Sequence, residues 1–341
     1  MSASTNRLDW VDAAKGLSII LVVMMHSAYG VGEDLNGTGI LHYVIGWATP
    51  FRMPEFFLIS GLFLSQVIAR DWLKFSDRRI LHYFYFYALW AVIQIVFKVG
   101  LGTGDPVSMV QQIALAIVDP YGVLWFIYML AVFSLMTKLL WDLRVNSWVA
   151  LGIAAVLQIL PIGNTGSYII DQFAEYFVYF FAGYALAPWI FKFVAWAQDR
   201  VVLALGALLA YAVINGVLVF TGGFEMNPVH VEMGFANLPL LHLVLAVAGS
   251  LALCVTAALL SKLDFMEWLR WLGANSIVVY LSFSIPMALT RVILLKVGIT
   301  DDTSILSIAV MLSALISPAG VVLRSNCSVQ SRLHHPDSSG R

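Results

Sequence analysis

Residues 12–27 read Asp12-Ala-Ala-Lys15-Gly-Leu-Ser-Ile-Ile-Leu-Val-Val-Met-Met-His26-Ser27 and contain a long apolar run. Blocks of about 20 such residues recur along the chain, separated by short polar connections. As a helix, each block matches the ~30 Å hydrocarbon layer of a bilayer, and no soluble core needs this arrangement. The sequence therefore predicts an all-α polytopic membrane protein.

The composition of the 341 residues points the same way. Hydrophobic residues make up 60% and charged residues 11% of the chain, against roughly 45–50% and about 25% in soluble domains. Lys and Arg number 19 and Asp and Glu 20, so a basic nucleic-acid-binding domain is excluded. The two cysteines, Cys254 and Cys327, have no metal-ligand spacing, and no metal site is expected.

The apolar blocks predict about ten transmembrane helices. Their ranges are 13–31, 44–69, 80–100, 121–141, 147–163, 172–194, 201–221, 238–260, 273–295 and 304–323. Together they form a single transmembrane domain over residues 1–323. The remaining segment, 324–341, is polar and is expected to be a disordered tail.

The basic residues predict the orientation of the helices, because Lys and Arg accumulate in cytoplasmic loops. Of the 19, 15 fall in the termini or in the connections on one side of the predicted bundle, 3 fall on the other side, and Arg52 lies within the second span. Both termini are therefore expected in the cytoplasm. The first span is not expected to be a cleaved signal peptide, because Asp9 and Asp12 interrupt its basic flank.

The first span carries two ionisable residues, and such residues in a membrane point to a function because each costs at least ~2.5 kcal/mol. Lys15 and His26 lie on one face of the expected helix, about 16 Å apart along its axis. His26 is suited to act as a general base on a hydroxyl group at neutral pH. In the structural alternative, Lys15 extends to the headgroups and pairs with Asp12, and His26 only hydrogen-bonds a neighbouring helix.

The second span contains Pro50-Phe-Arg52-Met-Pro54-Glu55. Two prolines are expected to break the helix, and irregular backbone at membrane depth occurs where it is buried in protein or lines a wet cavity. In one interpretation Arg52 and Glu55 neutralise each other as a structural pair. In the other they face His26, where Arg52 binds an anionic or carbonyl oxygen and Glu55 binds sugar hydroxyls or orients the imidazole.

The connection after the second span is strongly basic. Its cationic residues are Arg70, Lys74, Arg78 and Arg79. The tendency of Lys and Arg to accumulate in cytoplasmic loops would by itself explain these four residues. Alternatively, they hold the phosphates of a cytoplasmic nucleotide-bearing donor, because arginine binds phosphate through two parallel hydrogen bonds.

Four local patterns follow one another along the chain. They are the run from Arg7 to Gly16 followed by His26, then Pro54-Glu55-Phe56-Phe57-Leu-Ile-Ser60-Gly61, then Leu124-Trp125-Phe126-Ile-Tyr128, and finally Leu272-Gly273-Ala-Asn275-Ser276-Ile-Val-Val-Tyr280-Leu281. In their order and spacing the chain resembles the membrane-bound acyltransferase family 3, which contains bacterial sugar O-acetylases. The resemblance extends to about residue 318.

The resemblance implies an enzyme of the bacterial inner membrane that moves an acyl group, usually acetyl, from a cytoplasmic acyl-CoA to a hydroxyl of a sugar or lipid-linked glycan. It implies that His26 is the catalytic histidine, that Lys15 is the basic member of its motif, and that Arg78 and Arg79 bind the donor. Glu55 departs from the family pattern, which has an apolar residue there. The second departure follows Tyr280-Leu281. Many relatives have a histidine there, and this chain has Ser282-Phe283.

We therefore expect an integral membrane O-acyltransferase with His26, Arg52 and Glu55 as catalytic residues. Its expected partners are acyl-CoA as donor substrate, a carbohydrate or lipid-linked acceptor and the lipid bilayer, without nucleic acid and without a permanently bound cofactor. His26 would deprotonate the acceptor or accept the acyl group itself. Two alternatives stay open, namely a secondary transporter or export permease with the same intramembrane His/Arg/Glu set, and a catalytically silent membrane scaffold.

Overall fold

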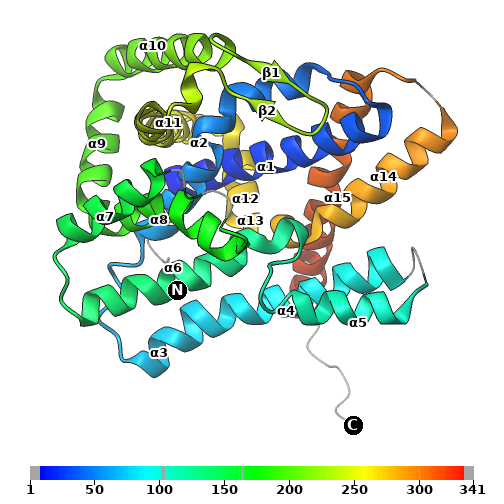
Figure 1. Ribbon diagram of the computed structural model, residues 1–341, viewed down its shortest axis with the longest axis horizontal. Coiled ribbons are helices and arrows are strands. Elements are labelled where there is room, and N and C mark those ends of the chain that lie inside the picture. Colours follow the sequence, from blue (N-terminus) through cyan, green and yellow to red (C-terminus); the bar gives the residue numbers. More distant parts are fainter. Residues whose placement is uncertain (1–7, 101–103, 161, 163–164, 299, 334–341) are drawn as a thin grey trace.

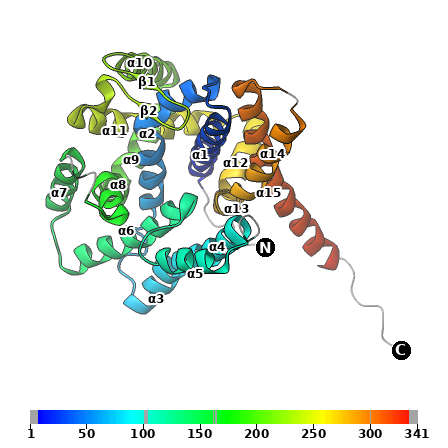
Figure 2. The same ribbon diagram turned by 45° about the vertical axis from the view of Figure 1, so that its right-hand side comes forward.

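The computed structural model is almost entirely helical and describes residues 8–100, 104–160, 162, 165–298 and 300–333. Helices surround α1 (Asp9–Leu35) and α2 (Ile40–Leu62), which lie between α7 on one side and α14 and α15 on the other in both views (Figures 1 and 2). A short antiparallel hairpin, β1 (Glu225–Met226) with β2 (Val231–Glu232), covers one end of α2. The described part of the chain is an all-α membrane bundle, as predicted.

The chain after α2 forms a long helix with two local π-helical turns, a short lateral helix and two further helices. These elements are α3 (Trp72–Ser76), η1 (Asp77–Leu81), α4 (His82–Ile95), η2 (Val96–Gly100), α5 (Pro106–Leu115), η3 (Gly122–Leu124), α6 (Trp125–Asp142) and α7 (Ser147–Ile159). Asp105 caps α5, because its carboxylate accepts hydrogen bonds from the backbone N–H groups of Ser108 (3.3 Å) and Val107 (3.0 Å). Hydrogen bonding to Ser108 and Val107 holds the pKa of Asp105 below its ordinary value.

The second half of the chain contains two bent helix pairs. Its elements are α8 (Tyr168–Ala185), α9 (Ala187–Asp199), α10 (Val201–Phe220), η4 (Phe235–Asn237), α11 (Pro239–Leu260), η5 (Asp264–Met266), α12 (Glu267–Ala274), α13 (Ser276–Ser282), α14 (Ser284–Val297) and α15 (Thr303–Leu333). The bend between α8 and α9 is 77°, and that between α13 and α14 is 48°. The predicted span 172–194 crosses the first bend, because its apolar run continues while Pro188 starts a new helix.

Length and hydropathy of the described helices support a protein that crosses the membrane several times. Five helices are long and apolar enough to do so, or up to seven when each bent pair forms one span. α2 is outside this set, and α7 and the first part of α15 are shorter apolar helices. The count of ten therefore stays a prediction. α15 continues to Leu333 and residues 334–341 lie outside the described residues, so the expected disorder of 324–341 stays a prediction.

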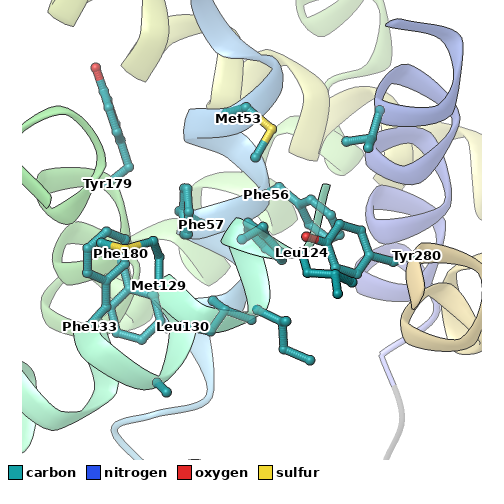
Figure 3. Packing of buried hydrophobic residues seen from close by; sticks show 14 of the residues in the cluster. Met53, Phe56, Phe57, Leu124, Met129, Leu130, Phe133, Tyr179, Phe180 and Tyr280 are labelled. Atoms are coloured by element: carbon teal, nitrogen blue, oxygen red, sulfur yellow. The ribbon is translucent and has the colours of Figure 1, made fainter. Parts of the chain in front are cut away.

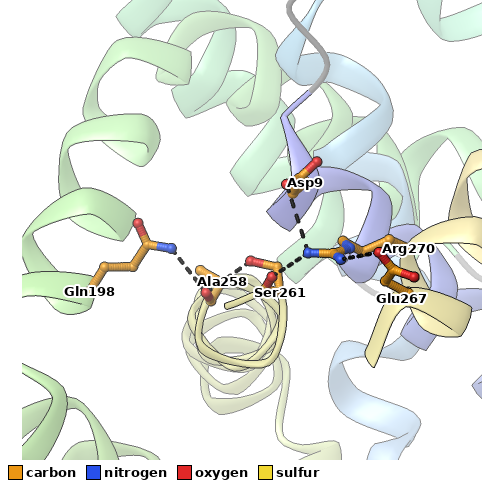
Figure 4. Close-up of polar contacts among 6 residues, drawn as sticks. All are labelled: Asp9, Gln198, Ala258, Ser261, Glu267 and Arg270. Carbon is orange, nitrogen blue, oxygen red and sulfur yellow. Dashed lines mark hydrogen bonds and ion pairs between the residues drawn. The ribbon is translucent and has the colours of Figure 1, made fainter. Parts of the chain in front are cut away.

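Polar contacts join several basic connections at one end of the bundle, which we call the basic end (Figure 4). Arg270 pairs with Asp9 (3.8 Å) and Glu267 (3.5 Å) and donates a hydrogen bond to the carbonyl of Ser261 (2.7 Å). Gln198 from α9 donates to a carbonyl of α11 (2.9 Å). These bonds tie the start of α1 to the connections around α9, α11 and α12.

A second set of contacts gathers the remaining connections at the opposite end. Arg291 of α14 pairs with Asp34 at the end of α1 (3.1 Å). His42 of α2 hydrogen-bonds through Nε2 to the carbonyl of Pro228 in the hairpin loop (3.0 Å). Each set of contacts joins connections that the orientation prediction assigned to one and the same side of the membrane. Which end faces the cytoplasm stays a prediction.

Glycines allow close approach of helices at two crossings. A Cβ atom on Gly273 would collide with the backbone of α1, and one on Gly16 would collide with the backbone of α12. Likewise, a Cβ atom on Gly61 of α2 would collide with the backbone of α8, and one on Gly183 of α8 would collide with the backbone of α2. Small residues at such crossings are typical of membrane helices, where close backbone packing replaces the hydrophobic effect. These crossings hold α12 and α8 against the two central helices.

An aromatic core fills the space between α2, α6 and α8 (Figure 3). The ring of Phe57 lies 4.6 Å from that of Phe126 and 5.0 Å from that of Phe133, measured between centroids. Phe133 in turn lies 5.6 Å from Phe180. Such large buried rings give the site described next a rigid wall.

Candidate active site

A cavity of about 270 Å³ lies between α1, α2, α4, α6, α12 and α13, near the basic end. All four of the sequence patterns contribute to its lining, through Lys15, Ser60, Phe126 and Tyr280. Arg79, from the basic connection after α2, also lines it. Segments that are far apart in sequence thus meet at one cavity, which we call the basic-end cavity.

Lys15 and Arg79 supply the positive charge of this cavity. The ammonium group of Lys15 is 4.0 Å from the carboxylate of Asp12, the pairing that the structural alternative predicts. Arg79 donates a hydrogen bond from Nη1 to the hydroxyl of Tyr83 (3.4 Å). Arg78 is exposed and does not line the cavity, because consecutive helical residues point about 100° apart. Of the two arginines expected to bind the donor, Arg79 lines this cavity and Arg78 does not, and their role stays a prediction.

A chain of rings leads from the basic-end cavity to His26. The centroids of Phe126 and Tyr280 are 5.6 Å apart, and Tyr280 is 6.4 Å from Phe283. Phe283 lies 5.5 Å from the imidazole of His26. The hydroxyl of Tyr280 donates to the carbonyl of Val123, which fixes its ring between α6 and α13. We call Phe126, Tyr280 and Phe283 the aromatic partition.

His26 lies on the far side of this partition from the cavity and is partly exposed. Arg52 and Lys98 are within electrostatic reach of its imidazole. Tyr29, one helical turn after His26, interacts through its hydroxyl with the guanidinium group of Arg52. The structure therefore brings His26 and Arg52 into one polar region and adds Lys98 and Tyr29 to it.

Arg52 projects from a helix that remains continuous through Pro50 and Pro54. The expected break does not occur, because each proline removes only one backbone donor and the neighbouring hydrogen bonds keep the helix together. Nε and Nη1 of Arg52 are buried and have no hydrogen-bond partner among the described residues. Its neighbours are the neutral hydroxyls of Tyr29 and Tyr176. A guanidinium group in this position is suited to bind an oxygen anion.

Glu55 lies away from His26 and Arg52. Its carboxyl group is fully buried, and Oε2 is hydrogen-bonded to the hydroxyl of Ser18 on α1. Among the described residues Oε1 has no hydrogen-bond partner, and Glu55 and Arg52 exert no resolved charge interaction on each other. Within the described part of the chain, Glu55 forms no hydrogen bond or ion pair with Arg52 or with the imidazole of His26, and its expected role in binding sugar hydroxyls stays a prediction.

Three residues of this region were not identified from the sequence. Tyr29 is separated from His26 by one helical turn, and that spacing could have singled it out. From the sequence, Lys98 was counted only as one of the three basic residues on the less basic side of the predicted bundle. Tyr176 stands in an aromatic span that gives no signal of its own.

Comparison with known proteins agrees with the geometry. Residues 8–323 match the sequence model of a family described as an acyltransferase domain, Acyl_transf_3. The inner membrane protein YcfT of Escherichia coli (strain K12) is 35% identical to this chain over a stretch that covers 24% of this chain. The chain spans about a quarter of that relative's length, since the match covers 25% of it. No solved structure matches this chain.

Proposed function

This chain belongs to the membrane-bound acyltransferase family 3, and we propose that it moves an acyl group from acyl-CoA at the basic end to a hydroxyl of a sugar or lipid-linked glycan at the opposite end. The observation that carries the proposal is the position of the basic-end cavity and His26 on two sides of the aromatic partition. By the predicted orientation the basic end is cytoplasmic, where acyl-CoA is present.

The basic-end cavity is suited to the acyl-thioester arm of the donor. Its volume of about 270 Å³ is slightly below the usual range of ligand pockets, about 300–1,000 Å³. The narrow arm would enter it, while the nucleotide part would stay outside. Arg79 and Lys15 would then contact the donor phosphates or the thioester end.

Acyl transfer at this site requires a base and a group that stabilises negative charge. In direct transfer, the thioester end of the donor would pass the aromatic partition to reach His26, which takes the proton of the acceptor hydroxyl while that oxygen attacks the thioester carbonyl. Arg52 stabilises the oxyanion, the carbon–sulfur bond breaks, and the CoA thiolate receives the proton from His26. In a relay, the imidazole attacks the thioester carbonyl, and the carbon–sulfur bond breaks with release of the CoA thiolate. The acceptor hydroxyl then attacks the acyl-imidazole, whose carbon–nitrogen bond breaks, and the released imidazole takes the hydroxyl proton. Both routes depend on His26.

The direct test compares two histidine variants in liposomes supplied with radiolabelled acetyl-CoA. His26→Ala should lower transfer at least about 100-fold at unchanged membrane abundance. His82→Ala is the matched control, since His82 is exposed and should keep normal activity. An active His26→Ala protein would contradict the assignment, and a wild-type protein that neither binds nor hydrolyses acetyl-CoA would contradict the donor. Mass spectrometry of acid-quenched protein would reveal an acyl-histidine if the relay operates.

The acceptor and the cellular membrane belong to the same proposal. The name of the E. coli relative supports a location in the bacterial inner membrane. Mass spectrometry of glycans and lipids from cells with and without the gene would identify the acceptor. The transporter alternative is not favoured, because the family match is to acyltransferases and Glu55 lies apart from His26 and Arg52.

A further inference from the structure

Positive charge is concentrated around His26 although the end of the bundle that holds it is acidic. In the connections at that end acidic residues outnumber the basic ones, which are Lys98, Arg291 and Lys296. Two of these three lie close to the polar region of His26. The basic residues at this end are therefore gathered near His26 rather than spread evenly over the connections.

Arg52, Lys98 and Arg291 form a group linked by electrostatic range rather than by direct contact, which we call the outer cation cluster. Arg52 and Lys98 each act electrostatically on His26, and Arg291 acts on Lys98. The guanidinium group of Arg291 lies against Gly30, one turn after His26 on α1. Elements α1, α2, η2 and α14 therefore bring three cations near the imidazole.

The cluster has more positive charge than the described residues neutralise. Asp34 pairs with Arg291 at 3.1 Å. Lys98 lies over the ring of Tyr121, 5.9 Å from its centroid, and Arg52 lies near the neutral hydroxyls of Tyr29 and Tyr176 and near the imidazole of His26. Like charges held together in a partly desolvated site repel one another, and an anion from outside the protein would relieve the repulsion.

Arg52 and Lys98 are the two cations of the cluster that remain after Arg291 pairs with Asp34, and the acyl-transfer step uses only Arg52. An oxyanion develops on the thioester carbonyl, and Arg52 is placed to stabilise it. Lys98 is exposed and takes no part in the transfer step. A second cation beside the base suits an acceptor that brings a permanent negative charge.

We propose, building on the acyltransferase function above, that the acceptor is an anionic glycan or lipid-linked sugar whose phosphate or carboxylate group is bound by Lys98 within the outer cation cluster. Arg291 adds to the attraction, and its pairing with Asp34 fixes its position. The hydroxyl to be acylated would lie close to the anionic group, since His26 and Lys98 are neighbours.

Binding of three soluble probes to the full-length protein tests this inference. The probes are glucose 6-phosphate, glucuronic acid and glucose, titrated calorimetrically into protein in phosphatidylcholine nanodiscs with the donor cavity saturated by CoA. The charged sugars should bind about tenfold more tightly than glucose, which corresponds to one charge-assisted interaction. The stronger of the two charged probes identifies the anionic group as phosphate or carboxylate.

Variants at the same end of the bundle provide the controls. Lys98→Gln should lose the tenfold preference, and Lys98→Arg should keep it. Lys296→Gln removes an exposed lysine outside the cluster and should leave the preference unchanged. Equal binding of glucose and the charged sugars, or equal effects of Lys98→Gln and Lys296→Gln, would overturn the inference.

Acetyl-CoA turnover, measured separately, distinguishes this inference from the function on which it rests. Acylation of neutral glucose without a preference for the charged probes would contradict the anionic acceptor and leave the acyltransferase function intact. Binding of the charged probes without any turnover of acetyl-CoA would contradict the acyltransferase function instead. Loss of probe binding in Arg79→Gln rather than in Lys98→Gln would place the anion in the basic-end cavity and overturn the inference.

Discussion

Ser18 of α1 and Glu55 of α2 are hydrogen-bonded to each other in the interior of the bundle. The hydroxyl of Ser18 also lies 2.8 Å from the carbonyl of Ala14. A hydroxyl carries one proton, so the two contacts can be separate hydrogen bonds, without one proton shared between two acceptors, only if the carboxyl group of Glu55 supplies a second proton. The geometry thus favours a neutral carboxylic acid, which avoids the cost of a buried, unpaired charge.

Glu55→Gln should therefore fold with nearly unchanged stability, because an amide can donate to Ser18 as the acid does. Glu55→Ala should lower the free energy of unfolding by about 1–3 kcal/mol through the lost hydrogen bond, plus the effect of the cavity left behind. Thermal unfolding in detergent measures both variants, and Glu33→Gln serves as an exposed control. Equal destabilisation by Gln and Ala would show that the group is charged.

Arg79 and Arg78 provide a matched pair for donor binding. Arg79→Gln should raise the KM for acetyl-CoA about tenfold, because Arg79 lines the basic-end cavity and one charge-assisted hydrogen bond would be lost. Arg78→Gln should leave KM within a factor of two or so, since its side chain is exposed. Steady-state kinetics with acetyl-CoA decide the outcome, and a larger effect at Arg78 would move the donor away from the cavity.

Arg52→Gln should reduce kcat with little change in the KM for acetyl-CoA. An interaction that forms mainly with the oxyanion of the transition state affects kcat, and loss of one such donor costs about 100-fold to 1,000-fold. Tyr29→Phe, which removes only the neighbouring hydroxyl, should have a much smaller effect. If Arg52→Gln changed KM alone, Arg52 would bind the ground-state substrate rather than the oxyanion.

Gly273 and Gly152 test the close crossing of α1 and α12. Gly273→Ala should destabilise the protein and lower activity, because its methyl group would collide with the backbone of α1 beside Lys15. Gly152→Ala should be neutral or slightly stabilising, since no atom lies within 4 Å of the added Cβ and alanine favours a helix by about 1 kcal/mol. Thermal unfolding and transfer assays of the two variants compare them directly.

Helical segments could be predicted from hydropathy, but their directions could not. The apolar run 172–194 contains a single charged residue, Glu175, before Lys192, yet the chain turns by 77° between α8 and α9. The hydropathy of a segment is the same whether its helix is straight or bent. Pro188 was the only local sign in the sequence that a new helix begins there. Conversely, Pro50 and Pro54 predicted a break in α2 that the surrounding helices prevent.

The candidate site was predictable only in part for a similar reason. The spacing of Lys15 and His26 places them on one face of α1, and the structure puts one at each side of the aromatic partition. Contacts between separate helices leave no trace in a single sequence. Ser18 opposite Glu55, and Lys98 beside His26, could therefore be found only from the fold.

The aromatic partition has a consequence for the energy metabolism of the cell. A protein that presents polar sites toward both faces of a membrane risks short-circuiting the proton-motive force, which does work of about 2.3 kcal/mol per elementary charge at 100 mV. Phe126, Tyr280 and Phe283 place aromatic rings between the two sites. We expect liposomes containing the protein to hold a pH gradient as well as empty ones, so that the transfer proposed above would proceed without draining the gradient that drives ATP synthesis.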